Sequence, residues 1–208
     1  NNTAVGYAAL DAATTANRST AVGAGALGAL TTGDNNVAVG YNAGNNITTT
    51  GQNTFIGRES GGSGGNGVTA IGFYACSNNT ADNTMGIGYN ALSANTTGAD
   101  NVALGNNSLQ TNTTGANNTA VGRLALNANT TANDNTALGY NSMTANTTGA
   151  QNTAVGKDAL DANQTAHDNT AMGVGALGVM NGGDGKNIAI GNYAGDAITT
   201  GNSNTLLG

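Results

Sequence analysis

The chain has 208 residues, of which 8% are charged and 4% aromatic, and its formal net charge is −6 with only five Lys and Arg. So few basic residues exclude a nucleic-acid-binding protein, which needs a basic stripe to neutralise phosphates. No apolar run approaches the roughly 18 residues of a membrane span. The single cysteine, Cys76, excludes an intrachain disulfide framework.

A pentapeptide of the form Asn-Thr-Ala-Val-Gly recurs from one end of the chain to the other. A fixed period this short predicts a solenoid or a fibre, in which each repeat packs only on its neighbours. Most closing glycines are 17 or 18 residues apart, and the two shorter intervals, 15 and 16 residues, are adjacent. The structural repeat glycines are Gly6, Gly23, Gly40, Gly57, Gly72, Gly88, Gly105, Gly122, Gly139, Gly156, Gly173, Gly191 and Gly208.

The three residues before each glycine predict a short strand, first at 3–5 and last at 205–207. The residue just before the glycine is always aliphatic, and the one three before it is β-branched except at Met85. Residues two apart share one face of a strand, so we expect Val121, Leu138 and Val155 to stack in a buried column. Alanine, two before the glycine, is then expected on the outer face. The glycine permits a corner that a Cβ would obstruct.

After the glycine a second pattern appears. The third residue is Ala or Ser and the fourth is usually Leu, which predicts a second short strand and a second buried column containing Leu109, Leu126 and Met143. The Asn-Thr-Thr-Gly runs that follow are turn chemistry. Repeated Gly and β-branched residues oppose helix. The prediction is an all-β parallel β-solenoid (a β-roll or β-helix) of about 12 coils with a 17-residue period.

In chain order, residues 1–57 and 89–208 are regular coils, and residues 58–88 form irregular, Gly-rich coils of the same solenoid. There the period shortens and Leu is lost from its slot, so we expect a thinner or kinked rod. A core of Ala and Leu is thin, and the expected outer face of Ala suggests that another chain covers it. We therefore expect a homotrimer or a comparable multimer.

Asparagine also precedes the strand in most repeats. Stacked on successive coils, these side chains predict a ladder whose amides bond one another or the turn backbone. The ladder residues are Asn2, Asn36, Asn53, Asn101, Asn118, Asn135, Asn152, Asn169, Asn187 and Asn204.

These iterated residues resemble the repeats in the heads of trimeric autotransporter adhesins, and still more the repeats of long bacteriophage tail-fibre proteins. The resemblance covers the whole chain and implies a trimeric left-handed β-roll or β-helix, extracellular or on a virion surface. Adhesin heads have a shorter period, so the connecting turns must differ.

Residues that suggest chemistry occur singly. The segments 23–28 and 173–178 fit a dinucleotide fingerprint but lack its strand and helix context. The Gly-rich run 61–66 has Asn where a calcium-binding repeat has Asp. Asp100, Asp134 and Asp168 share a turn slot with amides and read as solvated turn residues. His167 has no partner for a triad or metal site, and Cys76 occupies a Leu slot. We expect no enzyme, cofactor or metal.

Two recurring features admit a functional interpretation. Five turn asparagines begin Asn-X-Thr sequons and, stacked, would carry a rail of glycans: Asn95, Asn112, Asn129, Asn146 and Asn163. Paired threonines such as Thr96-Thr97 and Thr113-Thr114 suggest an ice-binding solenoid.

The leading hypothesis is a structural or adhesive segment of an extracellular or virion fibre, which projects a binding tip. Its partners would be copies of itself, as a homotrimer or end to end, and cell-surface glycans or a receptor through a tip outside this sequence. The alternatives are a subunit of a self-assembling extracellular filament that carries glycans, and an ice-binding solenoid. An enzyme acting on glycans through Asp158 or His167 is a further alternative.

Overall fold

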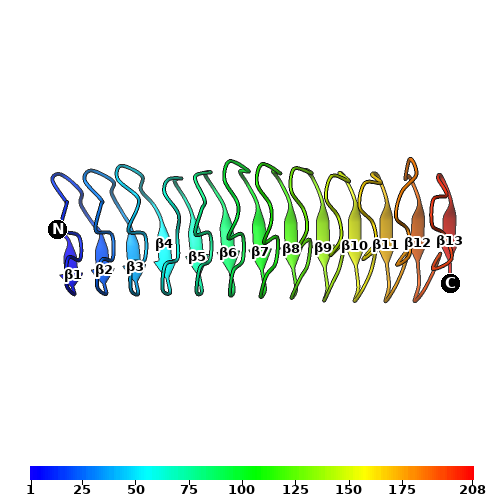
Figure 1. Ribbon diagram of the computed structural model, residues 1–208, viewed down its shortest axis with the longest axis horizontal. Helices are drawn as coiled ribbons and strands as arrows, with labels where there is room; N and C mark the ends of the chain where they lie inside the picture. Colours follow the sequence, from blue (N-terminus) through cyan, green and yellow to red (C-terminus); the bar gives the residue numbers. More distant parts are fainter.

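A computed structural model describes residues 1–208 as a rod of parallel β-coils with the termini at opposite ends (Figure 1). Each coil contributes one three-residue strand to a single 13-stranded parallel sheet in sequence order. The fold class predicted from the repeat is confirmed. The strands are β1 (Thr3–Val5), β2 (Thr20–Val22), β3 (Val37–Val39), β4 (Thr54–Ile56), β5 (Thr69–Ile71), β6 (Met85–Ile87), β7 (Val102–Leu104), β8 (Thr119–Val121), β9 (Thr136–Leu138), β10 (Thr153–Val155), β11 (Thr170–Met172), β12 (Ile188–Ile190) and β13 (Thr205–Leu207).

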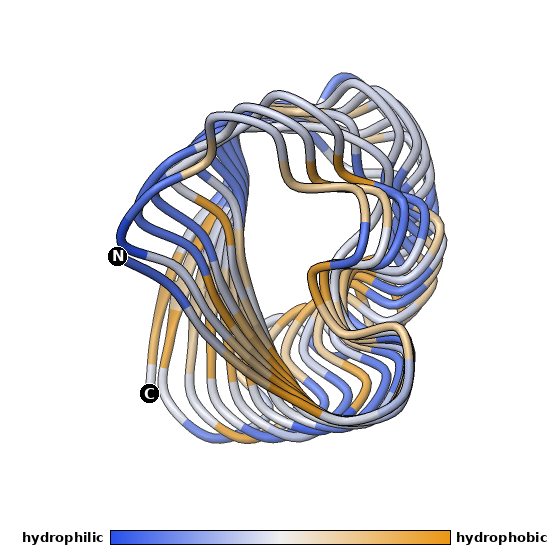
Figure 2. Ribbon diagram, turned by 90° about the vertical axis from the view of Figure 1, so that its left-hand side faces the viewer, coloured by the Kyte–Doolittle hydropathy of each residue, from blue (hydrophilic) through white to orange (hydrophobic).

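Equivalent repeat positions pair with one another along the whole sheet. Between β8 and β9, for example, Ala120 lies beside Ala137 and Val121 beside Leu138. Viewed down the axis, successive coils have the same shape and are slightly offset from one another, and like residues form columns that run along the rod (Figure 2).

The repeat glycines form one of these columns, and stacking makes glycine necessary there. Their φ angles lie between +130° and +144°, a region that side chains disfavour. A Cβ on Gly105 would also lie 2.5 Å from the carbonyl oxygen of Gly122 in the next coil. The prediction that a Cβ would obstruct this corner is confirmed.

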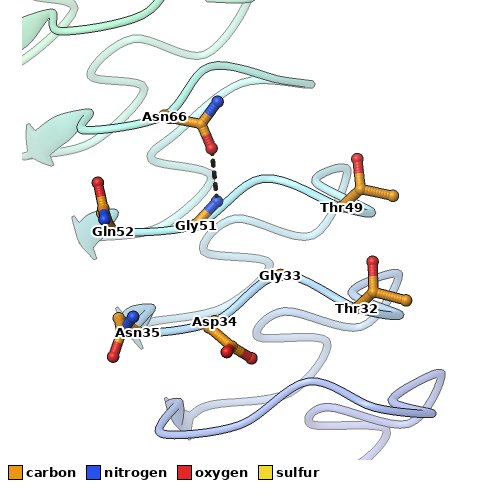
Figure 3. Close-up of a pocket in the computed structure, with 8 residues that line it drawn as sticks. All are labelled: Thr32, Gly33, Asp34, Asn35, Thr49, Gly51, Gln52 and Asn66. Atoms are coloured by element: carbon orange, nitrogen blue, oxygen red, sulfur yellow. Dashed lines mark hydrogen bonds between the residues drawn. The ribbon is translucent and has the colours of Figure 1, made fainter.

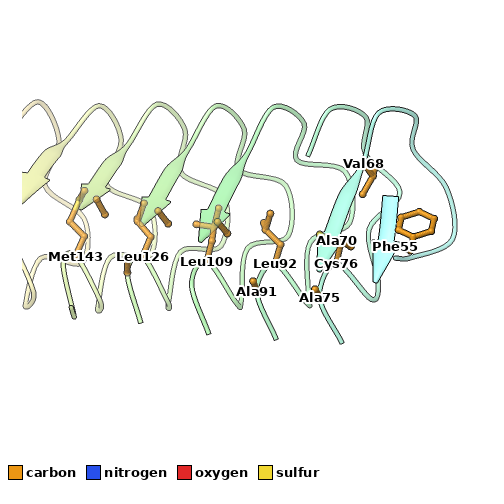
Figure 4. Packing of buried hydrophobic residues seen from close by; sticks show 14 of the residues in the cluster. Phe55, Val68, Ala70, Ala75, Cys76, Ala91, Leu92, Leu109, Leu126 and Met143 are labelled. Carbon is orange, nitrogen blue, oxygen red and sulfur yellow. The ribbon is translucent and has the colours of Figure 1, made fainter. Parts of the chain in front are cut away.

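The second strand expected after each glycine is absent, and a turn takes its place. Two residues of this turn lie in the left-handed region, as Asn107 (φ 55°) and Leu109 (φ 48°) illustrate. Two such residues so close together cannot continue an extended strand. The turn nevertheless places the fourth residue inside, so the predicted buried column of Leu109, Leu126 and Met143 is confirmed (Figure 4).

The strand faces are the reverse of those predicted. The central alanine of most strands is fully buried, whereas Leu104 and Leu138, just before their glycines, are 44% and 46% exposed. The column of Val121, Leu138 and Val155 does stack, but on the outside. The Leu column occupies the interior of this narrow coil and leaves only the width of a methyl group beneath the strand. The alanines therefore cannot form the surface that a partner covers.

The irregular segment 58–88 keeps the strand register, since β4, β5 and β6 remain paired position for position. Its coils are shorter than their neighbours, and no kink is seen (Figure 1). Phe55 replaces the usual buried alanine, and its ring lies against Gly44 and Gly61, the two glycines that replace Leu in the turn. One large side chain from the strand thus fills the space that two turn leucines leave.

Two other strands depart from the repeat at the alanine position. At Gly86 both facing positions are small, because Cys76 replaces the turn leucine and its Sγ would lie 2.5 Å from a Cβ on Gly86. Leu206 replaces the alanine of β13, and its side chain lies next to Gly195, another glycine in a Leu slot. A single hydrophobic core extends from Leu10 to Ala194.

Candidate interaction surfaces

The predicted ladder of asparagines before the strand is present, and its members from Asn36 to Asn187 are buried. The backbone N–H of Asn118 donates to Oδ1 of Asn101 at 2.9 Å, and Nδ2 of Asn118 donates to the turn carbonyl of Ala132 at 2.8 Å. The same backbone bond recurs between the corresponding asparagines of later coils. The ladder stabilises strand and turn together and offers no free binding stripe.

The five sequon asparagines form a second internal ladder, which begins at Asn79. Nδ2 of Asn129 donates to Oδ1 of Asn112 at 2.8 Å and to the carbonyl of Ala132 at 3.1 Å. Asn95, Asn112, Asn129, Asn146 and Asn163 are all fully buried. The amide nitrogen that a glycan would occupy is therefore internal and hydrogen-bonded in the folded rod, which corrects the expectation of a glycan rail.

A signal in the sequence could have indicated this burial. The same slot, seven residues after the glycine, holds Leu30, Ile47 and Met180 in other coils, and all three are buried. Apolar residues in that slot mark it as internal.

The outward face of the sheet is uncharged and half apolar. It carries two columns: the residue three before each glycine, which is Thr, Val, Ile or Met, and the aliphatic residue just before the glycine. No strand contains Lys, Arg, Asp or Glu. Exposed aliphatic side chains that continue along a whole molecule mark a surface for association.

A further exposed column lies at the edge of the sheet. It is formed by the residues directly after the repeat glycines and contains most of the aromatic residues. Tyr7, Tyr41, Tyr89 and Tyr140 are all exposed. The guanidinium of Arg123 lies 5.5 Å from the ring centroid of Tyr140, a cation–π contact. This edge presents flat rings to solvent at intervals along the rod.

The turn side of the rod holds a polar depression of about 330 Å³ lined by Thr32, Asp34, Thr49 and Asn66, among others (Figure 3). Its polar groups serve the stacking of coils, since the N–H of Gly51 donates to Oδ1 of Asn66 at 2.9 Å. The pKa of Asp34 is lowered because its carboxylate accepts the backbone N–H of Asn17 and a bond from Arg18. Asp34, Gly51 and Asn66 are thus engaged within the chain.

The residues that suggested chemistry remain isolated. The imidazole of His167 pairs with the carboxylate of its neighbour Asp168, at 3.0 Å on an exposed turn. Cys76 is fully buried, and desolvation raises the pKa of its thiol to about 12. No group of three or more His, Cys, Asp or Glu side chains is placed to hold a metal ion.

The paired threonines on the turns divide into two columns. Hydroxyls of the first column donate along the rod, from Thr96 to the carbonyl of Thr113 at 2.8 Å and from Thr113 to that of Thr130 at 3.0 Å. The second column, which includes Thr97 and Thr114, is exposed. Only one threonine of each pair therefore has a hydroxyl free for a ligand.

The structure contains no helix with the length and hydropathy needed to cross a lipid bilayer. No protein-family model matches the chain, and no curated protein or solved structure matches it significantly.

Proposed function

We propose that this chain is a shaft segment of an extracellular or virion fibre, in which copies associate through the outward face of the sheet and hold a binding tip away from the surface that anchors them. The observation that carries the proposal is the uncharged, half-apolar strand face, which continues over every coil. We infer three chains per fibre from the resemblance of the repeats to those of trimeric fibres.

The size of the face agrees with such an association. Twelve steps of about 4.8 Å and strands of about 10 Å give roughly 580 Å² per chain. Specific interfaces begin at about 600 Å² per partner. Exposed aliphatic columns such as Leu104 and Leu138 would supply the apolar centre of this interface.

Sedimentation equilibrium at micromolar concentration tests the proposal. The unmodified chain should sediment as a trimer, and the double variant Leu104→Lys/Leu138→Lys should sediment as a folded monomer, because charges on this face cannot be buried unpaired. Thr131→Lys, on the exposed turn side, is the matched control and should remain trimeric. A folded, monomeric unmodified chain would contradict the proposal.

A self-assembling filament is the second candidate, favoured by the repetition itself. β1 pairs only with β2 and β13 only with β12, so one edge of each terminal strand is unpaired in the isolated chain. Electron microscopy distinguishes the two roles. A filament subunit should elongate end to end as concentration rises, whereas a shaft segment should give particles of one length.

An ice-binding role is favoured by one further observation: nine strands place a threonine on the outward face, in a regular column. Thr136→Val and Thr153→Val keep the shape of this column and remove its hydroxyls. If the column binds ice, inhibition of ice recrystallisation should fall in the double variant while the sedimentation behaviour stays unchanged.

A further inference from the structure

A polar cleft lies where a regular coil meets the irregular segment. The cleft has a volume of about 330 Å³ and is lined mainly by Asn42, Asn45, Asn46, Glu59, Tyr74 and Asn78. Gly61, which takes the place of a turn leucine, also lines it. Three successive coils form the cleft, and the period shortens to 15 residues between the second and the third. Corresponding positions near the other end of the rod line a cavity of about 350 Å³, but there Asp158, Asp161 and Asp196 replace Asn42, Asn45 and Ser77. The set of neutral amides is therefore particular to the first cleft.

The longest run of stacked flat groups on the surface lies beside this cleft. It is formed by the residues directly after four successive repeat glycines, namely Tyr41, Arg58, Phe73 and Tyr89, and is here called the aromatic strip. The guanidinium of Arg58 lies 5.7 Å from the centroid of Tyr41 and 5.4 Å from that of Phe73. Phe73 and Tyr89 stack with centroids 5.5 Å apart and planes at 4°.

Several polar side chains of the cleft are free to bind a ligand. The side-chain amides of Asn42, Asn45 and Asn46 form no hydrogen bond within the chain, so each keeps a donor pair and an acceptor. Asn78 donates through Nδ2 to the carbonyl of Ser93 at 2.8 Å, which leaves its Oδ1 available.

The centre of the cleft is fixed in place. Glu59 pairs with Arg58 at 3.1 Å, and a hydrogen bond with the Glu59 carboxylate raises the pKa of the Tyr74 phenol. The Tyr74 ring also packs edge-on against Phe73 at 4.2 Å. The charges of Arg58 and Glu59 offset each other, so the site has no net attraction for a charged ligand.

We propose that the cleft and the aromatic strip bind a neutral glycan on the side of the rod. A pyranose ring has an apolar C–H face that packs on an aromatic ring, and hydroxyls at its rim that pair with amides and carboxylates. Flat exposed rings next to unpaired asparagines supply both halves of this recognition. The inference does not depend on the proposed shaft role, because it concerns a site within one chain.

Affinity electrophoresis of the full chain in native gels containing mannan, galactomannan or a mixed-linkage β-glucan tests the proposal. At least one neutral polysaccharide should retard the chain. Tyr41→Ala and Asn46→Ala should each weaken this binding about tenfold or more, since the first removes a stacking ring and the second an unpaired amide at an exposed position. Tyr140→Ala, on the same edge but outside the cleft, is the matched control and should bind normally.

Circular dichroism and sedimentation separate a loss of binding from a loss of folding or of association. Circular dichroism shows whether each variant folds, and Asn46→Ala decides the matter if Tyr41→Ala does not fold, because Asn46 is exposed and makes no hydrogen bond. Absence of retardation in every neutral polysaccharide would overturn the proposal. Retardation by heparin alone, or equal loss of binding in Tyr41→Ala and Tyr140→Ala, would also overturn it. Sedimentation of the same variants reports independently on the shaft role.

Discussion

At the scale of single residues, this fold depends on side chains in the left-handed region of φ. The turn leucines Leu109 and Leu126 have φ of 48° and 50°, at a cost of roughly 1–2 kcal/mol each. Burying a leucine contributes about 1.5–3 kcal/mol, so burial outweighs the strain. At the exposed turn slot five before the glycine the chain instead favours Asn and Asp, which tolerate this region with less strain.

The first prediction concerns that exposed slot. Asp134 has φ of 61° and is exposed. Asp134→Val should lower the free energy of unfolding by about 1–2 kcal/mol, because a β-branched side chain is disfavoured there. Asp134→Asn should be close to neutral. Urea denaturation of the two variants measures the difference, and equal stabilities would contradict the argument.

The second prediction concerns the internal sequon ladder. Asn129→Ala removes the donor to Asn112 Oδ1 and the acceptor that Asn146 uses at 3.1 Å. Buried groups left without partners cost about 1–3 kcal/mol, so the free energy of unfolding should fall by at least about 2 kcal/mol. Thr131→Ala, on the exposed turn nearby, should change it by less than about 0.5 kcal/mol. A small effect of Asn129→Ala in urea denaturation would show that the ladder does not stabilise the rod.

The third prediction follows from the buried thiol. The pKa of Cys76 is raised from its ordinary 9.0 to about 12, so the folded chain holds this proton more tightly than the unfolded chain. Stability from this group is complete below pH 9 and falls by about 1.4 kcal/mol per pH unit between pH 9 and pH 12.

Chemical denaturation at pH 8 and pH 11 checks this prediction. Cys76→Ala should lose less stability between the two pH values than the unmodified chain does. Iodoacetamide at pH 8 should modify Cys76 only after unfolding. Rapid alkylation of the folded chain would contradict the assigned burial.

At the scale of the structural element, the unit is the coil. Within it, the size of the buried strand side chain is matched to the size of the turn side chain that faces it. Where a larger side chain replaces the strand alanine, the facing turn position becomes glycine, as Phe55 with Gly44 and Gly61 shows. Interiors are close-packed, so a change on one side requires a change on the other.

The fourth prediction tests this exchange. Phe55→Ala should cost about 3–5 kcal/mol by opening a cavity. Gly44→Leu alone should also destabilise, because its side chain would collide with Phe55. The double variant should recover part of the loss, since the φ of Gly44, 59°, is close to that of the native turn leucines. Thermal unfolding of all four chains completes the cycle, and simple additivity would contradict the compensation.

At the scale of the whole molecule, the rod is close to one-dimensional. Every strand pairs only with its sequence neighbours, and both asparagine ladders connect adjacent coils. Stability is then approximately a sum over coils and the interfaces between them.

The fifth prediction follows from this additivity. Deletion of residues 123–139, one full period, joins Gly122 to Tyr140 in the normal repeat order. The rod should fold and shorten by about 4.8 Å. Deletion of residues 123–130 instead places turn residues in strand positions and should destabilise the chain strongly. Small-angle scattering gives the lengths and circular dichroism the stabilities. Equal stability of the two deletions would contradict the coil as the unit.

The sequence by itself determined the architecture, because a constant period with an obligatory glycine fixes parallel stacking and register. It also identified the ladder of asparagines before the strand and the buried column of Leu109, Leu126 and Met143. Each of these follows from repetition, which places equivalent residues on top of one another regardless of the path of the coil.

Only the tertiary structure decided which side chains of each strand and turn face the interior. Alternation within a three-residue strand separates Ala120 from Thr119 and Val121 but does not say which face is internal. The turn leucine fills the narrow interior and leaves room beneath the strand only for a methyl group. The sequon asparagines also lie inside the coil and form a ladder there, although their local sequence is typical of an exposed turn. The cleft beside Tyr41 forms because stacking brings Asn46, Glu59 and Tyr74 of three successive coils together.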